Sequence, residues 1–364
     1  MINRLYAYLV KYLDRTLLTL VAILLIVGLL TLYSASGARI ERVAAQMANI
    51  SAALLLMWIA ANVPLHYLSR IALPLYIIGM ILLIAVAIFG EIVNGARRWL
   101  DLGFTRIQPS ELMKIAVPLM LAWYFDRYEA VLKMRDFAVG ALLVLVPVLL
   151  IAQQPDLGTA VLVTAAGFFV LFLAGLSWKI LAALALAGGA SLPFLWSTLH
   201  DYQRQRVLTL LDPSQDPLGA GYHTIQSTIA LGSGGVFGKG WLNGTQSHLD
   251  FLPERTTDFI FAVYAEEFGL VGNLLLMVLF LLVIGRGLVI AANAPTLFTR
   301  LLASAITLTF FTYAIVNMGM VSGILPVVGV PLPLISYGGT SLVTILFGVG
   351  LLMSIQTHRR LVQT

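Results

Sequence analysis

The sequence predicts an all-α, polytopic integral membrane protein with about ten transmembrane helices. Hydrophobic residues make up 60% of the 364 residues and charged residues only 11%. The mean hydropathy is +0.94, and apolar windows long enough to cross a bilayer recur along the chain. This composition is typical of multi-pass membrane proteins and excludes an ordinary soluble domain.

The apolar windows set the expected order of the helices. They fall near residues 16–34, 45–63, 71–89, 110–124, 137–153, 157–175, 178–198, 258–286, 301–323 and 338–356. An even number of spans places both termini on the same side. We therefore expect a single transmembrane domain over residues 1–364, with one large loop, 199–257, between the seventh and eighth spans.

Lysine and arginine are distributed unequally between the two sides of this topology. The side of the termini carries Arg4, Lys11, Arg15, Arg70, Arg127, Lys133, Arg135, Lys179, Arg286, Arg300, Arg359 and Arg360. The short loops on the other side carry Arg39, Arg42, Arg97, Arg98 and Arg106. Because basic residues favour the cytoplasmic side, both termini are predicted to be cytoplasmic and the 199–257 loop extracytoplasmic.

The 199–257 loop is long enough to suggest a function of its own. Residues 222–231 have apolar side chains at helical spacing, which predicts a helix lying on the membrane. A glycine-rich run follows at 232–240, but no strand precedes it and no Walker pattern is met, so it is a weak nucleotide site. Basic residues in an outer loop oppose the charge rule and indicate an anionic ligand; they are Arg204, Arg206, Lys239 and Arg255.

The stretch FLPERTTDFIFAVYAEE at 251–267 concentrates charge beside an apolar span. Thr256 or Thr257 is expected to cap a helix, with Asp258 in its first turn. Asp258 is therefore either a capping acid or a surface carboxylate that meets a lipid-linked substrate. Glu266 lies about 80° from Asp258 around the helix, whereas Glu267 faces the side opposite Asp258. Each glutamate either belongs to a structural ion pair or lines a cavity.

The third connection ends in QPSELMK at 108–114, where Glu111 and Lys114 are neighbours on one helix face. They either neutralise each other, or Lys114 faces a polar cavity and meets an anion. Arg98, beside Trp99, suits a phosphate next to a sugar ring or an ordinary interfacial anchor. Asp156 of QPDLGT either caps the next helix or lines the same outer cavity.

The last connection, GILPVVGVPLPLISYGGTS at 323–341, contains three prolines, which no continuous helix tolerates. We expect an irregular or re-entrant segment whose backbone is satisfied by protein or by a wet cavity. Ser336 begins SYGGT, which could form an amide nest for pyrophosphate or a simple turn. The chain contains no cysteine, so thiolate metal sites and disulfides are excluded.

Several long motifs occur in one order along nearly the whole chain. They are YSASG (33–37), GARRWLDLG (95–103), QPSELMK, QPDLGT, LDPSQDPLGAGYHTIQS, GSGGVFGKGW, FLPERTTDFIFAVYAEEFGLVG and the late GILPVVGVPLPLISYGGTS. Together they closely resemble the SEDS family. The short amino terminus and KGWLNGTQS resemble the branch that acts in cell elongation rather than the branch that acts in division.

The resemblance implies a peptidoglycan glycosyltransferase of the bacterial cytoplasmic membrane that polymerises lipid II on the extracytoplasmic face. The family's essential acid corresponds to Asp258, expected as the general base of an inverting transfer with undecaprenyl pyrophosphate as leaving group. Glu111 and Lys114 would be cavity residues. The substrate-binding candidates are then Glu111, Lys114, Arg204, Arg206, Lys239, Arg255, Arg98, Asp156, Glu266 and Ser336.

The resemblance also bears on partners and cofactors. It implies a class B penicillin-binding protein as the transpeptidase partner within the elongation machinery, and no nucleic acid. No cofactor is required by the sequence, although Asp258 and pyrophosphate oxygens are hard ligands suited to Mg²⁺ or Mn²⁺. Two other functions stay open: a lipid II flippase, and a non-catalytic scaffold for a penicillin-binding protein.

Overall fold

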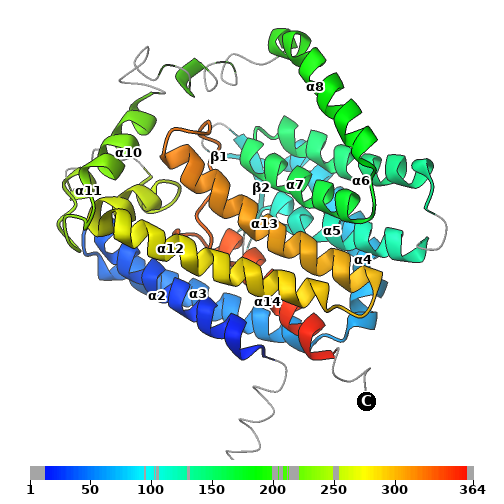
Figure 1. The fold of residues 1–364 in the computed structure, drawn as a ribbon, viewed down its shortest axis with the longest axis horizontal. Coiled ribbons are helices and arrows are strands. Elements are labelled where there is room, and N and C mark those ends of the chain that lie inside the picture. Colours follow the sequence, from blue (N-terminus) through cyan, green and yellow to red (C-terminus); the bar gives the residue numbers. More distant parts are fainter. Residues whose placement is uncertain are drawn as a thin grey trace, which may run out of the picture.

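The computed structural model describes residues 13–93, 96–101, 103, 106–128, 132–198, 204, 208–210, 212, 221–248 and 254–358, and it is mainly helical (Figure 1). Its elements in chain order are α2 (Arg15–Ala35), α3 (Ile40–Asn62), α4 (Leu65–Phe89), β1 (Glu91–Val93), β2 (Ala96–Asp101), β3 (Arg106–Ile107), α5 (Pro109–Arg127), α6 (Met134–Gln153), α7 (Leu157–Leu173), α8 (Trp178–Thr198), α10 (Tyr222–Ser233), α11 (Thr245–His248), α12 (Ile260–Ala292), α13 (Leu297–Val321) and α14 (Thr340–His358).

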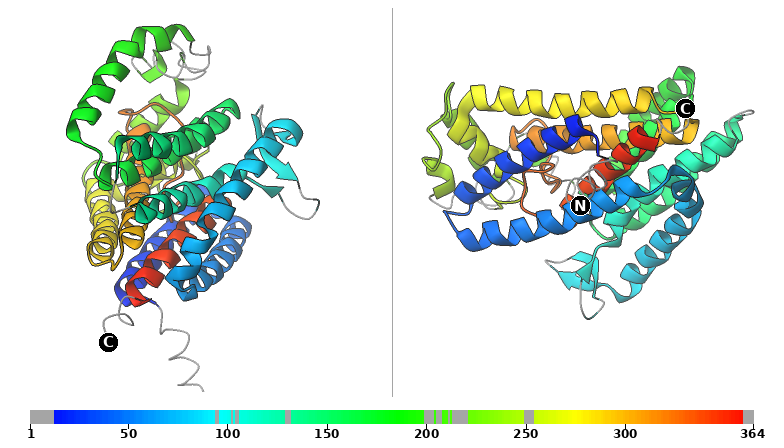
Figure 2. Two further views of the ribbon diagram at one scale, coloured as in Figure 1. Left: turned by 90° about the vertical axis from the view of Figure 1, so that its right-hand side faces the viewer. Right: turned by 90° about the horizontal axis from the view of Figure 1, so that it is seen from below.

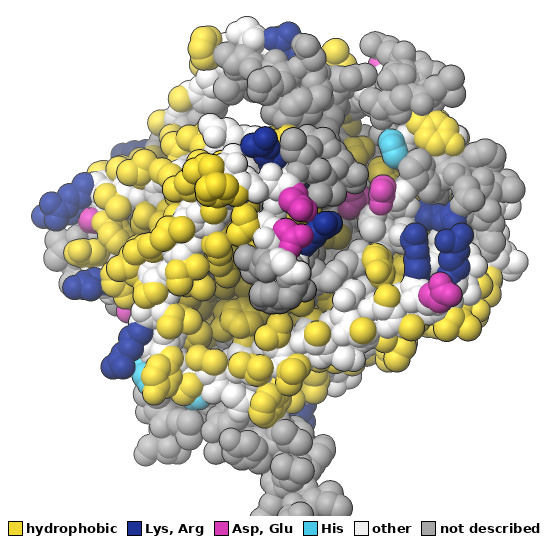
Figure 3. Space-filling view, turned by 180° about the vertical axis from the view of Figure 1, so that it is seen from behind, with side chains coloured by type: hydrophobic (Ala, Val, Ile, Leu, Met, Phe, Trp, Pro, Cys, Tyr) yellow, Lys and Arg dark blue, Asp and Glu magenta, His cyan; other side chains and the backbone are white. Residues whose placement is uncertain are grey.

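Each of the ten predicted apolar windows coincides with a helix in the described part of the chain. Seven of these helices are long and apolar enough to cross a membrane: α2, α3, α4, α6, α12, α13 and α14. A broad band of hydrophobic side chains covers the face seen in Figure 3. The chain is thus a multi-pass membrane protein, while the count of ten spans stays a prediction.

Helix α13 lies at the centre of the bundle. It packs against α12, α5, α7 and α14, while α3 runs along α14 and α2 along α12 (Figure 1). Its buried side chains include the polar residues Tyr313 and Asn317. Buried polar groups are expensive in an apolar environment unless they are hydrogen-bonded, so these two residues must have partners on neighbouring elements.

The third connection forms a small antiparallel sheet in the order β1-β2-β3, which the all-α prediction did not include. In both views of Figure 2 it lies at the margin of the bundle, on the side opposite α12. Val93 pairs with Ala96 across the first turn. The two residues between them are Asn94-Gly95 in the sequence, the preferred pair for a two-residue hairpin, and this signal could have predicted the strands.

Helix α10 confirms the helix predicted over 222–231 and packs on α12, with Thr224, Ser227 and Ala230 buried. The Ser227 hydroxyl donates a 3.0 Å hydrogen bond to the carbonyl of Val321, at the end of α13. Helix α10 is therefore attached to the bundle. Helix α8, by contrast, projects away from the other helices (Figure 1).

Helix α12 is interrupted at Gly269, where φ is +64° and ψ is −161°. The two hydrogen bonds that an unbroken helix would make here, from Leu270 and Val271 to the carbonyls four residues earlier, are replaced. Their amides donate to the carbonyls of Gly235 and Val236, at 2.9 and 3.1 Å. The glycine-rich loop is thus inserted into the break.

The inserted loop also occupies the carbonyls that the break leaves behind. The Lys239 amide donates to the Glu266 carbonyl and the Gly240 amide to the Glu267 carbonyl, each at 3.0 Å. Gly238 lies so close that a Cβ there would be 2.1 Å from the Glu267 carbonyl oxygen. The glycines therefore allow backbone packing against α12, and these amides are bound to protein rather than available to a phosphate.

The segment between α13 and α14 is irregular, as its prolines predicted. Its apolar side chains Val330, Leu332, Leu334 and Ile335 are buried. Helix α2 approaches closely because Gly28 has no side chain: a Cβ there would be 2.7 Å from the carbonyl oxygen of Leu334. The part of the segment from Val330 to Ser336 is thus packed mainly inside protein, as expected for non-helical backbone in a membrane protein, whereas Ile324 and Gly329 are exposed.

Candidate functional site

Asp258 lies on a turn formed by residues 254–259, and helix α12 begins only at Ile260. The N-cap is Phe259, which makes no side-chain capping bond. Thr257 donates its hydroxyl proton to the Glu254 carbonyl and carboxylate instead of capping. The predictions of a threonine N-cap and of Asp258 in the first helical turn are therefore wrong, and the capping explanation of Asp258 loses its basis.

Partners outside α12 bind the backbone of this turn. The amide of Tyr337 donates to the Thr256 carbonyl at 2.9 Å, and the hydroxyl of Ser336 donates to the Thr257 carbonyl at 2.7 Å. The Asn317 side-chain amide donates to the Asp258 carbonyl at 2.8 Å. These carbonyls are turned away from α12 toward α13 and the irregular segment, which is the physical reason the helix begins late.

The Asp258 side chain is half-buried and lies against Gly329 of the irregular segment. A Cβ built on Gly329 would be 3.4 Å from the Asp258 Oδ2 atom. On the other side of the turn, the ring of His223 from α10 stacks on Phe259 with centroids 5.6 Å apart. Arg42 of α3 donates to the Thr256 hydroxyl at 3.0 Å. Elements distant in sequence therefore meet at Asp258.

Glu111 and Lys114 form the predicted i, i+3 ion pair, with the Lys114 Nζ atom 2.6 Å from the Glu111 Oε1 atom. Lys114 also donates to the hydroxyl of Tyr313 on α13 at 2.6 Å, and Thr344 of α14 donates to the second Glu111 oxygen at 3.1 Å. The Lys114 side chain is only 3% exposed. Its charge is thus held inside the bundle by three helices.

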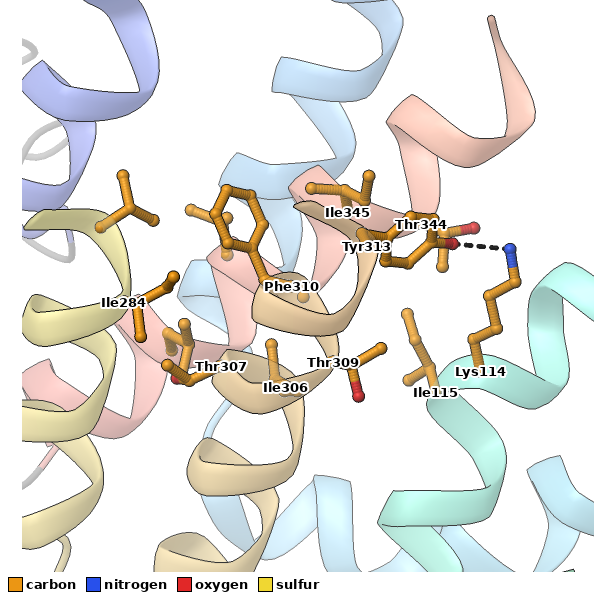
Figure 4. Close-up of a pocket in the computed structure, with 14 residues that line it drawn as sticks. Lys114, Ile115, Ile284, Ile306, Thr307, Thr309, Phe310, Tyr313, Thr344 and Ile345 are labelled. Atoms are coloured by element: carbon orange, nitrogen blue, oxygen red, sulfur yellow. Dashed lines mark hydrogen bonds between the residues drawn. The ribbon is translucent and has the colours of Figure 1, made fainter. Parts of the chain in front are cut away.

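Lys114 and Tyr313 lie at one end of a cavity of about 50 Å³ between α5, α12, α13 and α14 (Figure 4). The rest of the lining is mainly apolar and includes Ile284, Phe310 and Ile345. Lys114 thus forms the ion pair and also borders a cavity, but this cavity is mainly apolar, not the polar one expected, and contact of Lys114 with an anion stays a prediction.

Asp156 caps α7, as one of its two predicted roles required: its Oδ1 atom accepts from the Thr159 amide at 3.1 Å. Its Oδ2 atom accepts from the side chains of Gln108, at 2.8 Å, and Ser110, at 3.3 Å. Arg98 donates to the backbone carbonyls of Gln154 and Pro155. The motifs GARRWLDLG, QPSELMK and QPDLGT are thus bound to one another at this end of the bundle.

Glu266 and Glu267 face two different environments, as predicted from their spacing. Glu266 is fully buried and forms an ion pair with Lys239 at 2.7 Å; it also accepts from the Thr245 amide at 2.9 Å. Glu267 accepts from the hydroxyl of Ser34 on α2. Glu266 and Lys239 therefore hold the loop on α12, and their contact with substrate stays a prediction.

The remaining candidates are spread over the chain. Arg204 donates to the carbonyls of Trp196 and Ser197, at 3.0 and 2.7 Å, near the end of α8. Arg255 lies on the same turn as Asp258 and is half-buried. Arg206 lies outside the described residues. Ser336 accepts from the Leu332 amide at 2.8 Å. With Tyr337 bound to Thr256, part of the supposed amide nest is engaged within the protein.

The described residues contain no group of three or more His, Asp or Glu side chains arranged to hold a metal ion. Asp258 is a single hard carboxylate, so a divalent cation would need further oxygen ligands from a phosphorylated substrate. The donor set therefore fits a cation that arrives with its ligand, and does not fit a site made only of protein.

Sequence reasoning missed Asn317 and Tyr313. Both are polar side chains inside an otherwise apolar helix, and in a membrane such residues are usually buried against a partner. This rule could have selected them. Their partners, Asp258 and Lys114, could not be identified from spacing because they belong to other elements.

The family model described as "Cell cycle protein", for FtsW, RodA and SpoVE, matches residues 14–361. The chain is 54% identical over 351 residues to the peptidoglycan glycosyltransferase MrdB of Escherichia coli (strain K12), covering 96% of this chain and 95% of MrdB. It is 34% identical over 352 residues to the peptidoglycan glycosyltransferase RodA of Treponema pallidum, covering 77% and 81%.

Solved structures agree with these relatives. A chain described under "Structural coordination of polymerization and crosslinking by a peptidoglycan synthase complex" superposes with a TM-score of 0.83 at 35% identity, covering 95% of this chain and 98% of that one. The rod shape determining protein RodA of Thermus thermophilus superposes with a TM-score of 0.72 at 32% identity, covering 95% and 97%.

Proposed function

The chain belongs to the FtsW/RodA/SpoVE family and is a peptidoglycan glycosyltransferase, and on that basis we propose that Asp258 is the general base of the transfer. In this proposal lipid II is both donor and acceptor. The Asp258 carboxylate removes the proton of the acceptor sugar hydroxyl as that oxygen attacks the anomeric carbon, and undecaprenyl pyrophosphate leaves. The α-linked donor and the β-linked product fit a single inverting displacement.

The placement of Asp258 is the observation that carries this proposal. Its carboxylate is half-buried on a turn whose backbone is fixed by Asn317 and Ser336. A general base that must accept a proton from one hydroxyl benefits from a rigidly held backbone, since proximity and orientation contribute strongly to catalysis. Asp258 precedes Phe259, the N-cap residue of α12, and so does not itself occupy the capping position.

Positive charge must stabilise the leaving pyrophosphate. Arg255, on the same turn as Asp258, is our first candidate, and Lys114 is the second. Lys239 and Arg204 are weaker candidates because neither lies on the turn of Asp258: Lys239 pairs with Glu266 in the loop, and Arg204 lies near the end of α8. A Mg²⁺ or Mn²⁺ ion held by Asp258 and pyrophosphate oxygens would supply further charge neutralisation.

The decisive test is Asp258→Asn in purified protein supplied with lipid II in detergent. A general base contributes about 10² to 10⁴-fold, so glycan chain formation should fall by that factor while expression and unfolding temperature stay near wild type. Lipid II binding should be retained if Asp258 acts as a base and reduced if it mainly holds a cation. Glu254→Gln, on the same turn, is the matched control and should remain active.

The same assay separates the enzyme from the two other functions. A flippase or a scaffold makes no glycan chains in detergent, where there is no membrane to cross and no partner synthase. Polymerisation by the Asp258→Asn protein at the wild-type rate would overturn the assignment of the base, without affecting the family membership of the chain.

The cellular setting is proposed from the relatives. We place the chain in the bacterial cytoplasmic membrane, with both termini inside and Asp258 on the outer face, as the lysine and arginine distribution predicts. The similar chain from a peptidoglycan synthase complex supports a crosslinking partner, for which a class B penicillin-binding protein is our candidate.

A further inference from the structure

We infer that Asn317 and Gly329 are positioning residues for the Asp258 carboxylate: Asn317 fixes the backbone that carries it, and Gly329 keeps side-chain atoms out of contact with its Oδ2 atom. The inference rests on the proposed role of Asp258 as the base. Neither residue needs to touch the substrate, since each acts through Asp258.

Asn317 is completely buried in α13, the central helix of the bundle. Its Nδ2 atom donates to the Asp258 carbonyl at 2.8 Å and to the Val330 carbonyl at 2.7 Å. One amide group therefore joins the turn of Asp258 to the irregular segment that faces it. Both carbonyls would lose these hydrogen bonds if the side chain were apolar.

The bond from Asn317 completes a series of three. The carbonyls of residues 256, 257 and 258 accept in turn from Tyr337, Ser336 and Asn317. A backbone fixed at three successive residues leaves the Asp258 carboxylate only its own side-chain torsions. Asn317 makes the last of these bonds at Asp258 itself, so its loss should affect the carboxylate most directly.

Gly329 faces the carboxylate from the opposite segment. Its φ of +72° favours glycine, and a Cβ there would be 3.4 Å from the Asp258 Oδ2 atom. Its backbone cannot easily withdraw, because Gly158 of α7 packs behind it: a Cβ on Gly158 would be 3.1 Å from the Gly329 carbonyl oxygen. A side chain at 329 would therefore be directed at Asp258.

Helix α13 contacts both Asp258 and the buried Lys114 ammonium group. Tyr313, which binds Lys114, and Asn317, which binds Asp258, are separated by four residues and so lie on one helix face, about 6 Å apart along the axis. The helix thus sets the spacing between the proposed base and the Lys114 charge. A change at Asn317 should alter the base while leaving the lysine in place.

The first experiment measures kcat and KM for lipid II in Asn317→Leu, with Asn62→Leu as control. Within the part of the chain that the structure describes, Asn62 donates to a carbonyl of its own helix, that of Trp58, at 2.7 Å. We expect kcat of the Asn317 variant, per folded protein, to fall about 10- to 100-fold with little change in KM, as for a misplaced catalytic group. The control should keep the wild-type kcat.

The second experiment compares Gly329→Ala with Gly323→Ala. Both glycines lie in the irregular segment with nearly equal φ, +72° and +73°, and both would bring a Cβ to 3.4 Å from a neighbour. At Gly323 that neighbour is a methyl group of Thr228 instead of the carboxylate. The two variants should lose similar thermal stability, whereas only Gly329→Ala should lose kcat.

Asp258→Asn is assayed in parallel, so that failure of this inference is distinguishable from failure of the proposed function. If Asp258→Asn is inactive while Asn317→Leu and Gly329→Ala keep the wild-type kcat per folded protein, the positioning role is wrong and the base assignment stands. If Asp258→Asn is active, the proposed function fails first. Equal kcat losses in Gly329→Ala and Gly323→Ala would also overturn the role of Gly329.

Discussion

Lys114 combines a buried charge with a position beside a cavity, and its contacts make the consequence of removing it predictable. Breaking a buried ion pair by changing one partner costs about 3–5 kcal/mol, because the other charge is left uncompensated. Glu111, 12% exposed in its side chain, still has Thr344 as a donor. The single variants should therefore both be destabilised.

We predict that the double variant Glu111→Gln, Lys114→Met regains most of the stability that either single change loses, but remains inactive. Recovery of stability follows from removing both charges. Continued inactivity follows if Lys114 meets the substrate pyrophosphate. Thermal unfolding and lipid II polymerisation measure the two effects separately, and restored polymerisation would show that the pair is purely structural.

A second ion pair supplies the control. Asp14, the N-cap of α2, and Arg286, in the last third of α12, form this pair. The Arg286 Nε atom lies 3.1 Å from the Asp14 Oδ1 atom. The double variant Asp14→Asn, Arg286→Met should recover both stability and polymerisation, because nothing places this pair at the site.

We predict that His223 makes folding sensitive to acid. Burial lowers the pKa of His223, and the nearby Glu254 carboxylate opposes this effect. The neutral imidazole is thus favoured in the fold, and its contribution to stability is present above the ordinary pKa of about 6.5 and lost as the pH falls through the lowered value.

The substitution His223→Phe keeps an aromatic ring on Phe259 but cannot be protonated. Its unfolding temperature should therefore decline less than that of the wild type between pH 7 and pH 5. Parallel declines in the two proteins would mean that other groups cause the acid sensitivity.

At the scale of elements, the glycine-rich loop and the break in α12 depend on each other. Gly238 and Gly235 both have positive φ, +80° and +58°, so alanine at either costs about 1–2 kcal/mol of backbone strain. Only at Gly238 would the new Cβ strike the Glu267 carbonyl; at Gly235 nothing lies within 4 Å.

Gly238→Ala should therefore lower the unfolding temperature clearly more than Gly235→Ala does. The difference between the two variants isolates the close approach of the loop to α12 from the strain that they share. Equal losses would indicate that the loop withdraws from the break at little cost.

The elements also show what sequence reasoning can supply. The helices followed from apolar length, the irregular segment from Pro326, Pro331 and Pro333, and the α7 cap from Asp156. The break at Gly269 could not be predicted from the sequence, because a single glycine inside an apolar run is compatible with an unbroken helix. The late start of α12 depends on Asn317, Ser336 and Tyr337, and no local pattern contains those partners.

At the scale of the whole molecule, the topology can be tested with single cysteines, since the chain has none of its own. Asn243 lies in the loop inserted into the break of α12, Asn293 is the C-cap of α12, and both are exposed. We predict that Asn243→Cys is labelled by a membrane-impermeant thiol reagent in intact spheroplasts and Asn293→Cys only after permeabilisation. The reverse pattern would invert the topology and move Asp258 to the cytoplasmic face.

The site as a whole was only partly predictable. Asp258, Glu111 and Lys114 stood out because charges beside apolar spans need a reason to be there. Their arrangement around α13 could not be predicted, because it depends on Tyr313 and Asn317. Sequence spacing alone cannot pair these two residues with partners on other elements. The basic residues of the 199–257 loop were chosen by charge, and Lys239 and Arg204 proved to have protein partners.

The insertion of the loop into α12 also gives the molecule an internal reporter. The amide hydrogens of Leu270 and Val271 are bonded to the loop carbonyls of Gly235 and Val236 instead of to their own helix. They can exchange with solvent deuterium only when the loop departs, whereas their helical neighbours exchange when α12 itself opens. The exchange rates of two amides inside a helix would therefore measure the movements of a loop that lies 35 residues earlier in the chain.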